Sequence, residues 1–285
     1  MPATPGSVTG THAPVAIGAI GGSGTRVVAA VAAGAGFELG DDLNEAMDNL
    51  AFTLLFKRPD VLTASDRDFA ALVGVFVKAM RGLGPLTEPE RDLVARAAAA
   101  PRPQHPARWL RKRARRLRAA AADSRPRSER WGWKEPNTHV VLDRLRAAMP
   151  SLRYVHVARH GVDMAYSANQ NQLQLWGRLL LGRPVEVTPA SALKYWCAVH
   201  RRVLALGRDM GSDFLFLRYD DLCREPREQV ARLLDFLGVE VSASELERLA
   251  GLIVRPQSIG RYAAHGLAGF DAADLAYVEE LGFSL

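Results

Sequence analysis

The chain of 285 residues is 48% hydrophobic and 24% charged, a composition typical of one large globular α/β domain or two small ones. Its formal net charge of +6 comes from one segment, because residues 101–130 contain 11 basic and 2 acidic residues; this uneven spread does not indicate a nucleic-acid-binding fold. No apolar run reaches the roughly 18–20 residues that span a bilayer, and the first residues lack the pattern of a secretory signal. We therefore expect a cytoplasmic protein without stable membrane insertion, in which Cys197 and Cys223 are reduced.

The start of the chain divides into a tail and the first structural unit. Residues 1–13 are rich in Pro, Gly, Ser and Thr and predict a flexible tail, and residues 14–285 predict a single domain. The apolar run 15–20 predicts a strand, which is followed by a glycine-rich turn and by a helix that begins near Thr25.

The rest of the chain continues this strand-to-helix pattern after a long interruption. Residues 41–130 are predicted to be mostly helical and to end in a basic arm, residues 101–130. Two more β-rich runs, residues 152–159 and 214–222, are each followed by an amphipathic helix. Repeated units of this kind predict an α/β fold with a central parallel sheet flanked by helices on both faces, whose ligands lie at the carboxyl ends of the strands.

The first turn has the chemistry of an anion cradle. A strand, a glycine-rich turn and a helix start leave backbone N–H groups and the positive end of the helix dipole directed at the turn. The residues that would form this site are Gly22, Ser23, Gly24, Thr25 and Arg26. A Walker A loop would end in Gly-Lys-Ser/Thr to reach the terminal phosphates of ATP or GTP, and this turn has no such lysine.

A second anion site is predicted after the second strand. Arg159 ends that strand, and Ser167 follows eight residues later, so both can lie at the ligand edge of the sheet. Arginine suits this role because its planar guanidinium group binds phosphate oxygens in pairs. The alternative is an ordinary surface arginine beside a helix serine.

Four motifs in a fixed order carry a resemblance to a known family. They are GGSGTR after the first strand, Lys134-Glu135-Pro136 before the middle strand, VARHGVDMAYS after it, and LRYDDLCREP near the third strand. Together they resemble the sulfotransferases of bacterial type that use 3′-phosphoadenosine 5′-phosphosulfate (PAPS). The resemblance spans residues 15–261 and implies a fold like that of the P-loop NTPases, with a helical insertion.

The resemblance also implies which residues hold the donor. The glycine-rich turn would hold the 5′-phosphosulfate, and Arg159 with Ser167 would hold the 3′-phosphate of PAPS or of its product, adenosine 3′,5′-bisphosphate (PAP). A later segment, with Ser258, Gly260 and Arg261, lies where the family closes over the 3′-phosphate and adenine. No metal ion is expected, since this donor does not require a clamped triphosphate.

One position departs from the family pattern. Many members carry lysine or arginine directly before Ser-Gly-Thr, and here that residue is Gly22. The charge that stabilises the leaving phosphate must then come from another residue, and Arg26 and Lys134 are the two candidates.

Lys134 and Glu135 are the leading catalytic candidates. Loose, in-line sulfuryl transfer needs a cation for the leaving group and a base for the acceptor's proton. We assign the first role to Lys134 and the second to Glu135, the alternative being a surface ion pair before a helix. Other acceptor-side candidates are Asp41, Asp42, Asp48, His139 and His160, which rank below Glu135 because caps and structural histidines are as common.

The basic arm is predicted to be a solvated, mobile helix, because Trp109, Leu110, Leu117 and a few alanines give it only a thin apolar stripe. It could instead be a lid that attracts an anionic acceptor, or a membrane-surface helix. The predicted activity is sulfuryl transfer to a hydroxyl or amine of a small-molecule or glycan acceptor. The alternatives are a P-loop kinase or other phosphotransferase, and a non-catalytic polyanion-binding protein. The acceptor's identity and the oligomeric state stay open.

Overall fold

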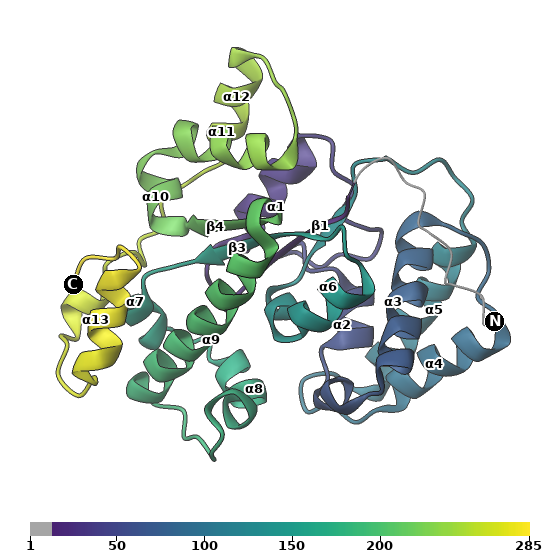
Figure 1. Cartoon of the computed structure of the whole chain (residues 1–285), viewed down its shortest axis with the longest axis horizontal. Helices are drawn as coiled ribbons and strands as arrows, with labels where there is room; N and C mark the ends of the chain where they lie inside the picture. Colours follow the sequence, from purple (N-terminus) through teal and green to yellow (C-terminus); the bar gives the residue numbers. More distant parts are fainter. Residues whose placement is uncertain (1–12) are drawn as a thin grey trace.

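A computed structural model describes residues 13–285, so almost all of the predicted tail lies outside the described residues (Figure 1). Its centre is a sheet of four parallel strands in the order β2-β1-β3-β4. The strands are β1 (Val15–Ala19), β2 (Gly132–Lys134), β3 (Arg153–Ala158) and β4 (Phe214–Arg218). The predicted parallel sheet is therefore confirmed, and all four carboxyl ends meet at one edge.

Helices cover both faces of this sheet, as predicted (Figure 1). Successive side chains of a strand point to opposite faces, so Val155 and Val157 of β3 join one apolar core and Tyr154 joins the other. The smaller core packs under α1 (Thr25–Gly34), α10 (Tyr219–Arg224), α11 (Pro226–Leu237) and α12 (Ala243–Ala250). The larger core includes α6 (Leu142–Ala148), α7 (Gly161–Ala165), α8 (Asn171–Leu181), α9 (Pro189–Met210) and α13 (Ala272–Glu280).

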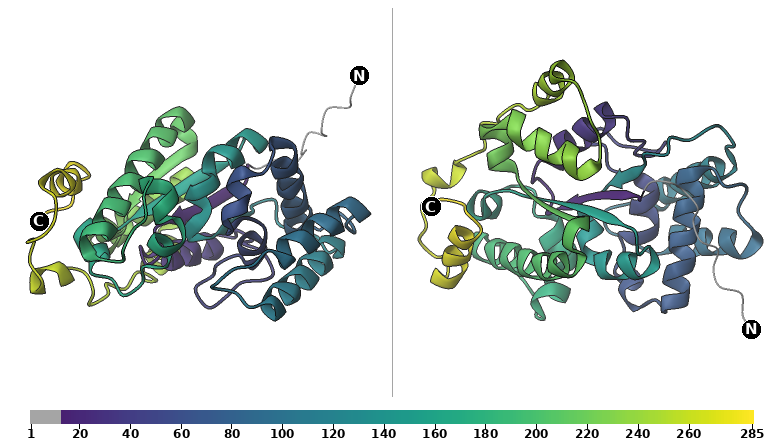
Figure 2. Two further views of the ribbon diagram at one scale, coloured as in Figure 1. Left: turned by 90° about the horizontal axis from the view of Figure 1, so that it is seen from below. Right: turned by 45° about the horizontal axis from the view of Figure 1, so that its top comes forward.

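The predicted helical insertion lies between α1 and β2. It contains α2 (Leu50–Phe56), η1 (Pro59–Thr63), α3 (Asp66–Arg81), α4 (Glu88–Ala99) and α5 (Ala107–Ala122). Figures 1 and 2 place this helical region at one end of the molecule, with α13 at the opposite end. The other short 3₁₀ helices are η2 (Pro136–Val141), η3 (Gly211–Asp213) and η4 (Arg261–Ala264).

The prediction of a solvated basic arm is wrong for one face of its helix. Helix α5 packs against α2, α3 and α4. Its buried residues are Leu110, Arg113, Ala114, Leu117 and Ala121. The alanines of this stripe let the helices approach closely, so a narrow apolar face is sufficient to bury it.

Two element boundaries differ from the prediction. The third strand ends at Arg218 rather than continuing to residue 222, and Tyr219 begins α10. Helix α7 ends at Ala165, so Ser167 lies beyond it and not within it. No helix of the described part of the chain is long and apolar enough to cross a membrane.

Candidate functional site

The glycine-rich turn leads from β1 into α1, as predicted. Gly22 and Gly24 have φ angles of 97° and 91°, a region that favours glycine, and Gly24 precedes the helix without a side-chain cap. The first N–H groups of α1 are therefore available to a ligand. A Cβ atom on Gly24 would lie within 2.8 Å of three atoms of the Tyr219 ring. The close packing of Tyr219 thus fixes the shape of the turn.

The turn contains a buried polar atom without a partner. Ser23 is 0% exposed, and its Oγ has no hydrogen-bond partner among the described residues. Thr25 is also buried, whereas Arg26 is exposed. A buried hydroxyl normally has a partner, so Ser23 fits a site whose ligand would supply one.

Arg159 connects this turn to the C-terminal part of the chain. Its guanidinium group donates to the hydroxyl of Ser258 at 2.8 Å and, at 3.5 Å, to the carbonyl of Gly22. The residue is 7% exposed, and its Nε is a second buried atom without a partner. The structure therefore brings Arg159, Gly22 and Ser258 together, which the sequence placed in three distant segments.

The C-terminal segment is held over Arg159 by a buried carboxylate. Asp163 in α7 accepts hydrogen bonds from the backbone N–H groups of Gly260, at 2.7 Å, and Tyr262, at 3.0 Å. Arg261 donates to the carbonyls of Ser258 and Tyr166 at 3.4 Å.

Ser167 forms its hydrogen bond within its own segment and not with Arg159. Its hydroxyl accepts from the N–H of Asn169 at 3.2 Å. A Cβ atom on Gly21 would lie 3.5 Å from the side-chain nitrogen of Asn169, so this segment borders the turn.

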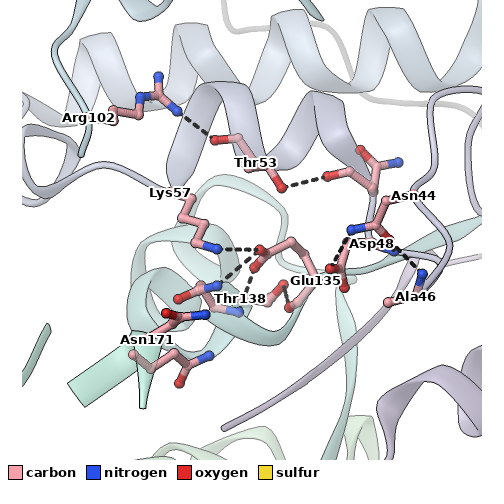
Figure 3. Close-up of polar contacts among 12 residues, drawn as sticks. Asn44, Ala46, Asp48, Thr53, Lys57, Arg102, Glu135, Thr138 and Asn171 are labelled. Carbon is pink, nitrogen blue, oxygen red and sulfur yellow. Dashed lines mark hydrogen bonds and ion pairs between the residues drawn. The ribbon is translucent and has the colours of Figure 1, made fainter. Parts of the chain in front are cut away.

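Lys134 ends β2, where it pairs in register with Ile17 of β1, and is almost completely buried. Its Nζ forms an ion pair with Asp48 and donates to the carbonyl of Ala46 at 3.0 Å. The loop that carries both acceptors is closed by Asn44, whose amide donates to the Asp48 carboxylate at 2.9 Å (Figure 3). Met47 in this loop has a φ of 63°, a strained value for a residue other than glycine. The structure therefore brings Asp48 and Lys134 together.

Glu135 lies next to Lys134 and is 1% exposed. Its carboxylate caps η2 by accepting hydrogen bonds from the backbone and side-chain nitrogens of Asn137. The Nζ atom of Lys57, the residue after α2, lies 4.0 Å from Oε1 of Glu135 (Figure 3). Burial raises the pKa of the Glu135 carboxyl, while the Lys57 ammonium lowers it.

Two of the aspartates proposed as acceptor-side residues are paired with arginines. Asp42 forms ion pairs with Arg113 and Arg116 of α5. Asp41 pairs with Arg125 and Arg127, and the hydrogen bond from Arg127 lowers the pKa of its carboxyl. Each carboxylate is thus paired with two arginines.

Both candidate histidines have hydrogen-bond partners within the protein. His139 is 1% exposed, its Nε2 is 3.0 Å from Oε1 of Gln172, and burial lowers its pKa to about 3. Its contact with the acceptor stays a prediction. His160 caps α7, stacks on Tyr262 with ring centres 4.5 Å apart, and contacts the carbonyl of Ser284 at 2.8 Å.

Three residues of the site were missed from the sequence. Tyr219 falls in the predicted strand 214–222, and neither Asp163 nor Lys57 is among the residues that the sequence singled out. Among residues 13–285 there is also no group of three or more His, Cys, Asp or Glu that could hold a metal ion.

Comparisons with known proteins agree with this architecture. A sequence model described as "Sulfotransferase family" matches residues 67–243, more than half of the chain. The matched part includes Lys134, Glu135, Arg159 and Ser167, whereas the glycine-rich turn lies outside it. No curated protein matches the sequence.

Solved structures resemble the fold over nearly its whole length. The sulfotransferase domain from the olefin synthase of Synechococcus PCC 7002 has a TM-score of 0.52 at 18% identity, covering 96% of each chain. The sulfotransferase domain from the curacin biosynthetic pathway has a TM-score of 0.50 at 13% identity, covering 96% of this chain and 99% of that one. At such low identities the similarity concerns the fold.

Proposed function

The chain belongs to the sulfotransferase family, and from this we propose that it transfers a sulfuryl group from PAPS to a hydroxyl or amine of a small-molecule or carbohydrate acceptor. The observation that carries the proposal is that two of the buried polar atoms without partners, Ser23 Oγ and Arg159 Nε, belong to the two predicted anion sites. They lie on two segments that meet at the carboxyl edge of the sheet, where ligands of such sheets bind. A donor with two separate anionic groups would satisfy both.

The donor would be held by its two ends. Backbone N–H groups of residues 22–26, with the hydroxyls of Ser23 and Thr25, would bind the 5′-phosphosulfate. Arg159, with Ser258 and Ser167, would bind the 3′-phosphate. The contact between Arg159 and Ser258 supports this assignment, because it brings the C-terminal segment onto the same guanidinium group.

Lys134 is the better candidate for the cation that replaces the one missing at Gly22. An ammonium group has three donors, and Asp48 and the carbonyl of Ala46 engage two of them. In this proposal the third would bind an oxygen of the transferred sulfate or leaving phosphate. Arg26 is exposed at the start of α1 and can contribute to the same charge.

The acceptor's proton requires a base. In the transfer, the acceptor oxygen bonds to sulfur while the bond from sulfur to the bridging oxygen breaks, leaving its electron pair on the 5′-phosphate. Glu135 is our first candidate for the base, because burial raises its pKa and brings it nearer to the range suited to proton transfer. Asp48 is the second, since it lies beside Lys134.

Thermal melting with added ligands tests the donor assignment. PAP should raise the melting temperature more than equal concentrations of ATP with magnesium, adenosine 5′-phosphosulfate or inorganic sulfate. Preferential stabilisation by ATP with magnesium would contradict the proposal and favour a phosphotransferase.

Acceptors of graded acidity test the two catalytic roles. Lys134→Ala should lower kcat by roughly 10²–10³-fold for all acceptors, the usual cost of one preorganised donor. Glu135→Gln should lower kcat by roughly 10²–10⁴-fold, and less for a nitrophenol, which needs little help to lose its proton. If Asp48→Asn shows that dependence and Glu135→Gln does not, the base is Asp48. If neither does, both assignments are wrong.

A further inference from the structure

A groove of about 1040 Å³ lies between α4 and α5, in the helical region. One wall is formed by alanines of α4, including Ala95 and Ala99, and the other by α5. Arg102 lines the groove and donates to two carbonyls of α2, that of Thr53 at 2.8 Å (Figure 3) and that of Leu54 at 2.7 Å. These bonds join the segment between α4 and α5 to α2. Its volume exceeds that of most small-molecule pockets.

The arginines of α5 divide into two sets. Arg113 and Arg116 are directed at Asp42 and form ion pairs with it. The second set is exposed and lines the groove, and within residues 13–285 none of its members has an ion-pair partner. These residues are Arg108, Arg111, Arg115 and Arg118.

The spacing of the second set suits a chain of negative charges. The four positions are separated by three, four and three residues, so they follow one face of the helix. At 1.5 Å per residue they span about 15 Å, with a cation at roughly every turn. A single phosphate or sulfate ion would meet only part of this row.

The same surface disfavours two other anionic partners, a membrane surface and a single-stranded nucleic acid. A membrane-surface helix inserts large apolar side chains, and among residues 13–285 no exposed large hydrophobic residue belongs to α5. Single-stranded nucleic acids are held by stacking on aromatic rings, but Trp109 is covered by His105, with ring centres 4.2 Å apart, and by Arg113.

We propose that this groove binds a linear acidic polysaccharide. Such a chain carries anionic groups on successive sugars at a spacing comparable with that of the arginines, and it needs neither stacking nor an apolar anchor. The small alanine side chains of α4 leave room for the sugar backbone beside the arginines. The inference concerns binding alone and does not depend on the transfer reaction.

The experiment measures binding of a heparin octasaccharide to the full chain by titration at about 50 and 200 mM salt. The test variant is R108Q/R111Q/R115Q/R118Q. The matched control removes four exposed arginines elsewhere, as R178Q/R183Q/R208Q/R232Q, and therefore has the same net charge. Both sets are exposed, so thermal melting should confirm that both variants are folded.

The wild-type chain and the control should bind the octasaccharide with similar Kd, and the groove variant should bind about tenfold more weakly or worse, because four modest ion pairs act together. Binding should weaken steeply with salt, and a neutral dextran of equal length should not bind. Equal losses in both variants would overturn the proposal. So would tighter binding of a single-stranded DNA oligonucleotide or of phosphatidylserine vesicles through the same four arginines.

Discussion

Packing of the Tyr219 ring on the glycine-rich turn makes Gly24→Ala an informative perturbation. At a φ of 91°, an alanine there incurs roughly 1–2 kcal/mol of backbone strain. Its Cβ would also lie within 2.8 Å of three ring atoms, and overpacking of this kind costs typically 1–3 kcal/mol. We therefore expect Gly24→Ala to lower the free energy of unfolding by about 2–5 kcal/mol.

A control glycine separates the two contributions. Gly182 has a φ of 69°, but a Cβ atom there would meet nothing within 4 Å, so Gly182→Ala should incur only the backbone part. In a Tyr219→Ala background, Gly24→Ala should likewise cost only about 1–2 kcal/mol.

Urea unfolding of the four variants measures these costs, and titration with PAP measures the effect on the turn. Gly24→Ala should weaken PAP binding at temperatures where the protein is folded, because the displaced turn moves its N–H groups. If Gly24→Ala costs no more than Gly182→Ala, and the Tyr219→Ala background changes nothing, the ring does not hold the turn and the reasoning fails.

Three further outcomes are expected. Burial lowers the pKa of His139 to about 3 and of His200 to about 4, from an ordinary 6.5. As the pH falls, these histidines therefore bind protons in the unfolded chain first, and the free energy of unfolding should decrease between about pH 6.5 and pH 3–4, by roughly 3 kcal/mol for His200 alone. A free energy of unfolding that stays constant over this range in urea titrations would contradict this. Arg159→Ala should weaken PAP binding by about 1.5–3 kcal/mol, the scale of a hydrogen bond to a charged group, but should hardly change the affinity for an analogue without the 3′-phosphate. If calorimetry shows equal losses of affinity for both ligands, Arg159 does not bind the 3′-phosphate. Sulfuryl transfer should persist in the presence of a chelator, and activity that is abolished and then restored by magnesium would favour a kinase-like enzyme.

The sequence alone determined the fold class and the position of the first turn. Strands, glycine-rich turns and helix starts depend on residues that are neighbours in the chain, so the start of α1 at Thr25 could be predicted directly. The parallel sheet followed from the repetition of such units, and the end of the second predicted strand placed Arg159 at the ligand edge. The short strand β2, which ends at Lys134, was not predicted and is seen only in the structure.

Only the tertiary structure decided which charged residues pair with one another. Asp41 and Asp42 looked equivalent to Asp48 in the sequence, but the first two meet arginines from residues 113–127, whereas Asp48 meets Lys134. Ion pairs of this kind join segments more than 70 residues apart in sequence, and no local pattern encodes them.

Contacts between segments that are distant in the sequence also explain the position of Tyr219 and the partial burial of the basic arm. Tyr219 touches the turn only because β4 and β1 lie in one sheet with β3 between them. The arm's arginines look alike in composition, yet packing of α5 against α2, α3 and α4 directs some inward and leaves others exposed. Which face of a helix is buried depends on its neighbours in space, and these exist only once the chain has folded.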